Sequence, residues 1–172
     1  KAINKGVLTD DIQSYVNAVL KVGKSKYKVK VKLKGTLRSH WTDPLVWSYR
    51  VVIKNGFCHE NGLKVFSIQS GSQRGKVVDL YYHYFLKSSG LISMKYSNIN
   101  FAINESIIPG YAIEEFFDSP LIIRNNRQIG PILKFVYDDY WEEDNLWKLP
   151  RDKKRISEVY ATTYKTSYAK SY

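Results

Sequence analysis

The sequence predicts an α+β fold: one N-terminal amphipathic helix packs on a mostly antiparallel, curved sheet, and a C-terminal extension follows. Three observations predict it. Apolar residues recur at helical spacing near the start, lysines then alternate with apolar residues, and strand-like runs separated by turn signals follow. The length of 172 residues allows one domain with an appendage. We place the domain at residues 1–127 and the extension, first acidic and then basic, at residues 128–172.

The predicted helix runs from Asp10 to Lys21. It begins after Thr9, a capping residue, with acidic side chains that suit the positive end of the helix dipole. Gly23 ends it. Its apolar residues recur at intervals of three and four, at Ile12, Tyr15, Val16, Val19 and Leu20. This stripe needs a sheet to cover.

Residues 26–34 predict a strand with two unlike faces, because lysine alternates with apolar residues at every position. Like charges at this spacing repel, so the charged face stays in water or meets anions. Two interpretations remain open: the lysines protect an edge strand from pairing, or they bind an anionic protein, nucleic acid or lipid. The lysines are Lys26, Lys28, Lys30, Lys32 and Lys34.

The rest of the first 127 residues predicts mainly strands. A short helix is expected at Ala112–Phe117, after Pro109-Gly110. The polar run Ser88-Ser89-Gly90 is expected to be a connection between strands. The expected strands are Val46–Ile53, Leu63–Gln69, Lys76–Leu86, Leu91–Tyr96 and Leu121–Arg124.

The C-terminal extension carries tyrosines at intervals of four, at Tyr160, Tyr164, Tyr168 and Tyr172. On a helix they would form an aromatic stripe that docks onto a neighbour. A frayed terminus is equally compatible with the pattern.

The formal net charge is +11, and it is distributed unevenly. Residues 1–40 carry +8, residues 41–100 carry +4, residues 101–150 carry −5 and the last 22 residues carry +4. This distribution predicts a basic face from the first half and an acidic patch from the third quarter. The two could also be solvated faces that partly neutralise each other.

No pattern predicts catalysis, so we predict no enzyme, no catalytic residues, no cofactor and no metal site. The single cysteine excludes an internal disulfide framework, and Cys58 and His59 would point to opposite faces of a strand. Residues 71–76 lack the spacing of a phosphate-binding loop. The acidic cluster at residues 138–144 is interpreted as a solvated surface. A hard-cation site or a hydrolase using Asp138 and Glu142 are the minor alternatives.

Three local patterns together resemble the intermembrane-space domain of the Tim-twenty-one family, a subunit of the mitochondrial inner-membrane presequence translocase. The first is the helix Asp10–Lys21 followed by Leu33-Lys34-Gly35. The second is the strand-loop-strand from Leu63 through Gly71 to Val78. The third is Leu121–Arg127, which is similar to the family's closing strand, with Asn125 in place of an acidic residue.

The resemblance implies a non-enzymatic protein-docking module on the intermembrane-space side of the mitochondrial inner membrane. It would serve presequence import or act as an accessory subunit of a respiratory-chain assembly. Its partner would be an acidic segment of an outer-membrane import receptor or subunits of a respiratory complex, with the membrane reached through a partner or an anchor upstream. A nucleic-acid-binding or viral structural protein is the alternative. The expected partner-binding residues are the five alternating lysines with Arg38, Arg124 and Arg127, and the four tyrosines form the docking tail.

Overall fold

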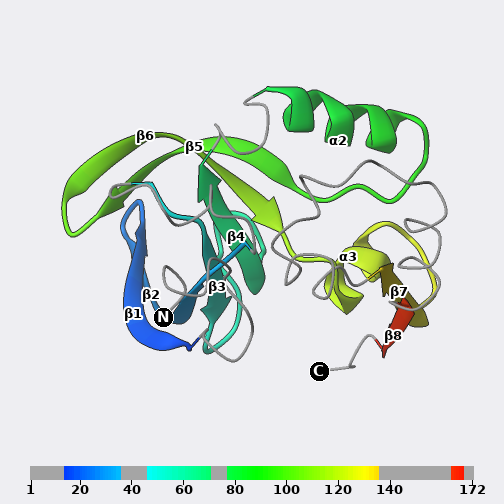
Figure 1. The fold of residues 1–172 in the computed structure, drawn as a ribbon, viewed down its shortest axis with the longest axis horizontal. Coiled ribbons are helices and arrows are strands. Elements are labelled where there is room, and N and C mark those ends of the chain that lie inside the picture. The colour runs from blue at the N-terminus through cyan, green and yellow to red at the C-terminus, as the bar shows by residue number, and fades with distance from the viewer. Residues whose placement is uncertain (1–13, 36–45, 71–76, 136–163, 169–172) are drawn as a thin grey trace, which may run out of the picture.

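The structure, a computed structural model, describes residues 14–35, 46–70, 77–135 and 164–168. Six strands form one antiparallel sheet in the order β1-β2-β3-β4-β6-β5. The sheet curls into a half-barrel, in which the long β5–β6 hairpin arches over one side and the β1–β2 hairpin forms the other (Figure 1). The strands are β1 Val16–Val22, β2 Ser25–Leu33, β3 Tyr49–Ile53, β4 Val65–Ser70, β5 Tyr96–Ile103 and β6 Ser106–Glu115.

Two short helices and a second, two-stranded sheet complete the described residues. Helix α2, Val78–Ser88, lies between β4 and β5 in the chain and packs beside β5 (Figure 1). Helix α3, Ser119–Arg124, follows β6. Strand β7, Pro131–Phe135, pairs with β8, Tyr164–Tyr168. The predicted α+β fold class is therefore wrong: the domain is mostly antiparallel sheet, and its described part has no N-terminal helix on it.

The main error is the N-terminal helix, because residues 16–22 form strand β1. A tight turn at Gly23-Lys24 folds β1 back onto β2, and seven consecutive residue pairs join the two strands. Gly23 has φ +54°, which glycine adopts without steric cost. The residues that face inward, Leu20 and Val22, follow period two. Pairing with a strong neighbouring strand thus overrides the helical spacing. Residues 10–13 lie outside the described part.

The predicted strand at residues 26–34 is confirmed as β2, and its alternation builds the core. Tyr27 and Val29 are buried, whereas the lysines between them are exposed. The buried residues contributed by β3, β4 and β6 face the same side, at Val51, Ile53, Phe66, Ile68 and Tyr111. The concave side of the half-barrel is therefore the apolar core.

Four other elements differ from prediction. The expected strand Lys76–Leu86 is largely helix α2. Its end has the hydrogen bonds of a Schellman motif, from the Gly90 N–H to the Lys87 carbonyl and from the Leu91 N–H to the Leu86 carbonyl. The expected strand at Leu121–Arg124 is helix α3, which begins where the Asp118 side chain accepts a hydrogen bond from the Leu121 N–H.

Residues 112–115 of the expected helix Ala112–Phe117 are instead the end of β6, which is paired on one side with β4 and on the other with β5. The expected strand Leu91–Tyr96 is a connection, and β5 begins only at Tyr96. The hairpin from β5 to β6 turns at Asn104 and Glu105, both at positive φ. Because neither residue is glycine, the turn gave no strong sequence signal.

Candidate functional site

Five exposed lysines lie on the outward side of the sheet, opposite the core. We call this surface the lysine face. In β1 and β2, Lys21 pairs with Lys26, and the Lys54 N–H donates to the Lys28 carbonyl at 3.0 Å, so β3 continues the same face. The lysine face consists of Lys21, Lys26, Lys28, Lys30 and Lys54, all of which are exposed.

The position of β2 in the sheet bears on what these lysines do. β2 is paired on one side with β1 and on the other with β3, so it is not an edge strand. The lysines from Lys28 to Lys34 therefore do not lie on a sheet edge, whereas Lys26 lies just beyond the stretch of β2 that is bonded to β3. Residues 14–35 contain seven lysines and no Asp or Glu, so the hairpin itself supplies no neutralising charge. Among the described strands the edge is β1, so the interpretation that these lysines lie on an edge strand does not fit the sheet order.

Lys32 and Lys34 leave the row of exposed lysines. The Lys32 ammonium lies 5.3 Å from the centre of the Tyr15 ring, a cation–π contact. The Lys34 ammonium forms an ion pair with Glu114 at 2.9 Å and donates to the Gln69 amide oxygen at 3.1 Å. Three of the five alternating lysines therefore remain on the lysine face. Lys21 and Lys54, which sequence reasoning missed, join them.

A row of polar side chains on the outward side of the sheet, Arg50, Ser67 and Glu114, contains the partner of Lys34. Arg50, Ser67 and Glu114 are direct neighbours across β3, β4 and β6. Ser67 and Glu114 are buried, and burial lowers the pKa of Arg50. The Arg50 guanidinium also lies 4.2 Å from the centre of the Phe116 ring. Buried charges need partners, and the Glu114 carboxylate is bonded to the Lys34 ammonium and the Gln69 amide.

Of the three arginines expected to bind a partner, Arg124 and Arg127 do not lie on the lysine face. Arg124 forms an ion pair with Glu115 and donates to the Ser93 carbonyl at 3.2 Å, which ties α3 to the sheet. Arg127 donates to the Gly90 carbonyl at 2.8 Å. Arg38 lies outside the described residues.

The tyrosine tail is described only in part. Tyr160 and Tyr172 lie outside the described residues, whereas Tyr164 and Tyr168 are the two ends of β8. Over this stretch the four-residue repeat is a strand, so it does not form the helical stripe that the spacing allowed.

Tyr27 stands on the side of β2 that faces away from the lysines. Its hydroxyl donates to the Glu60 carboxylate at 2.7 Å and accepts from the His59 N–H at 3.0 Å. This bond from Tyr27, with a second from Ser25, lowers the pKa of Glu60 to about 2. Because Tyr27 is buried and engaged, it cannot stack on a nucleic-acid base beside the lysines.

Cys58 and His59 do not form a catalytic pair. The Cys58 thiol is fully buried and donates to Glu60 at 3.2 Å, whereas His59 is exposed. Burial raises the pKa of the Cys58 thiol, and the Glu60 hydrogen bond adds to this effect. A protonated, inaccessible thiol is a poor nucleophile.

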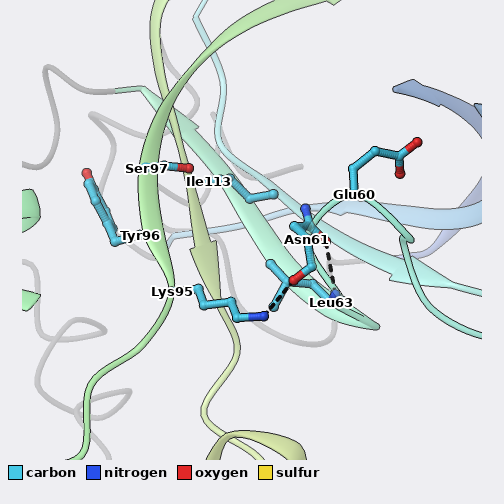
Figure 2. Close-up of a pocket in the computed structure, with 8 residues that line it drawn as sticks. Glu60, Asn61, Leu63, Lys95, Tyr96, Ser97 and Ile113 are labelled. Atoms are coloured by element: carbon cyan, nitrogen blue, oxygen red, sulfur yellow. Dashed lines mark hydrogen bonds between the residues drawn. The ribbon is translucent and has the colours of Figure 1, made fainter. Parts of the chain in front are cut away.

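An open depression of about 510 Å³ lies where the 60–63 loop meets β5 (Figure 2). Figure 2 shows Lys95 reaching the loop, where its ammonium donates to the Asn61 carbonyl at 2.7 Å. The Asn61 side chain in turn accepts from the Leu63 N–H at 2.9 Å. These polar groups hold the loop against the strand. We therefore interpret the depression as structural.

Helix α2 exposes more aromatic surface than any other described element. Tyr81, Tyr82, Tyr84 and Phe85 are each more than half exposed, and only His83 is buried, stacked on Tyr96 of β5.

No described helix is long and apolar enough to span a bilayer. Within the described ranges, no three His, Cys, Asp or Glu side chains are grouped as a metal site requires.

No protein-family model matches the chain, and no curated protein matches it. The resemblance to the Tim-twenty-one family therefore stays a prediction. Each of its three patterns takes other secondary structure here in part, since residues 16–21 are a strand, Val78 begins helix α2 and residues 121–124 are helical.

Proposed function

We propose that this domain is a non-enzymatic docking module that binds an acidic protein segment on the lysine face. The observation that carries the proposal is the gathering of five exposed lysines on one side of the sheet: four lie in the β1–β2 hairpin, which has no acidic residue, and Lys54 lies beside Lys28 at the end of β3. Such a surface attracts anions and repels cations.

The sheet gives this surface its rigidity. Lys28 and Lys30 project from a stretch of β2 that is bonded to strands on both sides, and Lys26 is paired with Lys21 of β1, so their backbone positions are fixed before binding. Fixed charges of one sign mainly raise the rate of encounter with an oppositely charged partner. Their effect decreases with salt, because exposed charges are screened over about 8 Å at physiological ionic strength.

The cellular setting of the proposal comes from the three local patterns described above. We propose that the module acts at the mitochondrial inner membrane, on the intermembrane-space side. There it would bind an acidic segment of an import receptor or subunits of a respiratory complex. Affinity purification of the tagged chain from mitochondria tests this part. Recovery with neither the translocase nor the respiratory chain would refute the setting and leave the acidic-segment proposal intact.

The binding proposal is tested with a fluorescent peptide of about eight alternating Glu and Thr residues, a typical strand length. We expect the Lys26→Glu/Lys28→Glu/Lys30→Glu variant to bind it far more weakly than the wild type. Each exposed pair contributes about 0.4 kcal/mol, and each reversal replaces attraction with similar repulsion. Three reversals give roughly 2 kcal/mol, about thirtyfold in the dissociation constant.

The matched control is Lys87→Glu/Lys95→Glu/Arg127→Glu, whose three positions are exposed and lie outside the lysine face. Because Lys95 and Arg127 each donate to a backbone carbonyl, thermal unfolding first establishes that the control is folded. Both variants lower the net charge from +11 by the same amount. The proposal requires the control to bind within about twofold of the wild type. Equal weakening of both variants would mean that only the net charge matters, and the proposal would be wrong.

Nucleic acid is the competing anionic partner. A phosphate backbone would give a steep decrease of affinity with salt, with a slope set by the number of phosphate contacts. Tighter binding of a single-stranded oligonucleotide than of the acidic peptide at physiological salt would favour this alternative. The burial of Tyr27 removes that ring from base stacking, whereas the Tyr15 ring beside Lys32 is 46% exposed, so only the salt response and the relative affinities decide between the two partners.

A further inference from the structure

We infer that the acidic segment binds as an additional strand along the free edge of β1, beside the lysine face. This inference rests on the proposed function and adds the mode of binding. Among the described strands, β1 is the last strand of the sheet, and only β2 pairs with it. Its seven residues contain no proline, and their register with β2 is continuous.

The backbone of β1 has hydrogen-bonding groups directed away from β2. The Lys28 carbonyl accepts from Lys54 and the Lys34 N–H donates to Ser48, so even-numbered residues of β2 bond toward β3. Their partners in β1, Asn17, Val19 and Lys21, therefore form the pairs without mutual hydrogen bonds. The N–H and C=O groups of these three residues point to the free edge, in the spacing that an added strand requires.

The side chains favour an acidic occupant. An added strand would place alternate side chains beside Asn17, Val19 and Lys21 on the outward face. Acidic residues there would lie next to Lys21 and within electrostatic range of the β2 lysines. The residues between them would lie on the other face, beside Ala18 and Leu20, where threonine or valine fits.

The usual protections of an edge are weak on β1. Natural edges carry lysine, proline or bulges, whereas β1 has one lysine, no proline and an unbroken register. The lysines lie one strand further in. Their charge opposes pairing with a second copy of this chain, because each copy would bring a hairpin with seven lysines and no acid. It does not oppose an acidic strand.

The test uses the Glu-Thr peptide and a Val19→Pro variant, with Val19→Thr as its matched control. Proline removes the outward N–H of residue 19 without removing a hydrogen bond to β2, because edge strands accept proline at such positions. We expect Val19→Pro to bind the peptide about fivefold more weakly and Val19→Thr to bind it like the wild type. Thermal unfolding establishes that both variants are folded.

Two further measurements make the outcome independent of how well the proline variant folds. N-methylation at every second residue blocks the N–H groups along one edge of the peptide strand. When the blocked edge is the one that meets β1, the peptide should bind the wild type at least tenfold more weakly. Hydrogen exchange of the Asn17, Val19 and Lys21 amides should slow on addition of the unmodified peptide. The lysine-face variant, Lys26→Glu/Lys28→Glu/Lys30→Glu, should also lose the peptide. If it does, but the peptide leaves hydrogen exchange of the wild-type β1 amides unchanged and N-methylation of the peptide has no effect, strand addition would be overturned and the proposed function would stand.

Unchanged peptide binding by the lysine-face variant would instead refute the proposed function itself. A protein that is dimeric on its own, and that becomes monomeric with Val19→Pro, would show that β1 pairs with a second copy. That result would overturn the acidic strand as the occupant of this edge.

Discussion

Replacing Glu114 with glutamine should destabilise the domain by about 2–3 kcal/mol, although glutamine has nearly the same volume. The Glu114 carboxylate is buried, bonded to the Lys34 ammonium at 2.9 Å and hydrogen-bonded by the Gln69 amide. Removing one partner of a buried pair typically costs about 3–5 kcal/mol, because the other charge is left uncompensated. Lys34 keeps 19% of its side chain exposed and retains Gln69 as an acceptor, so the lower figure applies here.

Urea unfolding measures this cost, with the m-value as a check that both variants unfold the same surface. The double variant Lys34→Met/Glu114→Gln should recover about half of the loss, because both charges of the pair are then absent. The reasoning would be refuted if Glu114→Gln lost less than about 0.5 kcal/mol, a typical surface effect. No coupling between the two positions would contradict it as well.

Three other predictions follow from the described contacts. The low pKa of Glu60, about 2 against an ordinary 4.5, means that its ionised form stabilises the fold above about pH 4.5; this contribution is lost as the pH falls toward 2. Tyr27→Phe should therefore reduce the pH dependence of the urea midpoint in this range, and an unchanged profile would contradict the link. Cys58 should not react with a thiol reagent in the native protein and should react fully once guanidinium chloride unfolds it; rapid native labelling would disprove its burial. Glu105→Gly should raise the free energy of unfolding by about 0.5–1 kcal/mol, because Glu105 has φ +72° in the β5–β6 turn, whereas a lower melting temperature would contradict this strain argument.

The sequence predicts those strands in which the alternation of apolar and polar residues is complete within the strand itself. The alternation of β2 is an example, since Lys26 to Leu33 needs no partner to reveal which side is buried. The predicted strand at residues 46–53 contains β3, and the one at residues 63–69 contains β4 except for its last residue, Ser70. β1 could not be predicted this way, because its residues fit a helix and a strand equally well. The Gly23-Lys24 turn and the partner strand decide between them.

The same limit applies to the candidate site. The alternating lysines are visible in the sequence, but that Lys34 reaches Glu114, eighty residues away, depends on a sheet order that no local pattern encodes. Lys21 and Lys54 join the lysine face only because β1 and β3 flank β2. A usable signal did exist for the polar row, since Ser67 and Gln69 alternate with Phe66 and Ile68 in β4.

The most direct test of acidic recognition by the lysine face is a charge exchange between the two partners. The Lys26→Glu/Lys28→Glu/Lys30→Glu variant is titrated with two peptides, the Glu-Thr peptide and its counterpart with Lys in place of Glu. We predict that the variant loses the acidic peptide and gains measurable affinity for the basic one, while the wild type binds only the acidic peptide. Retention of the acidic peptide by the variant, with wild-type affinity, would contradict the account.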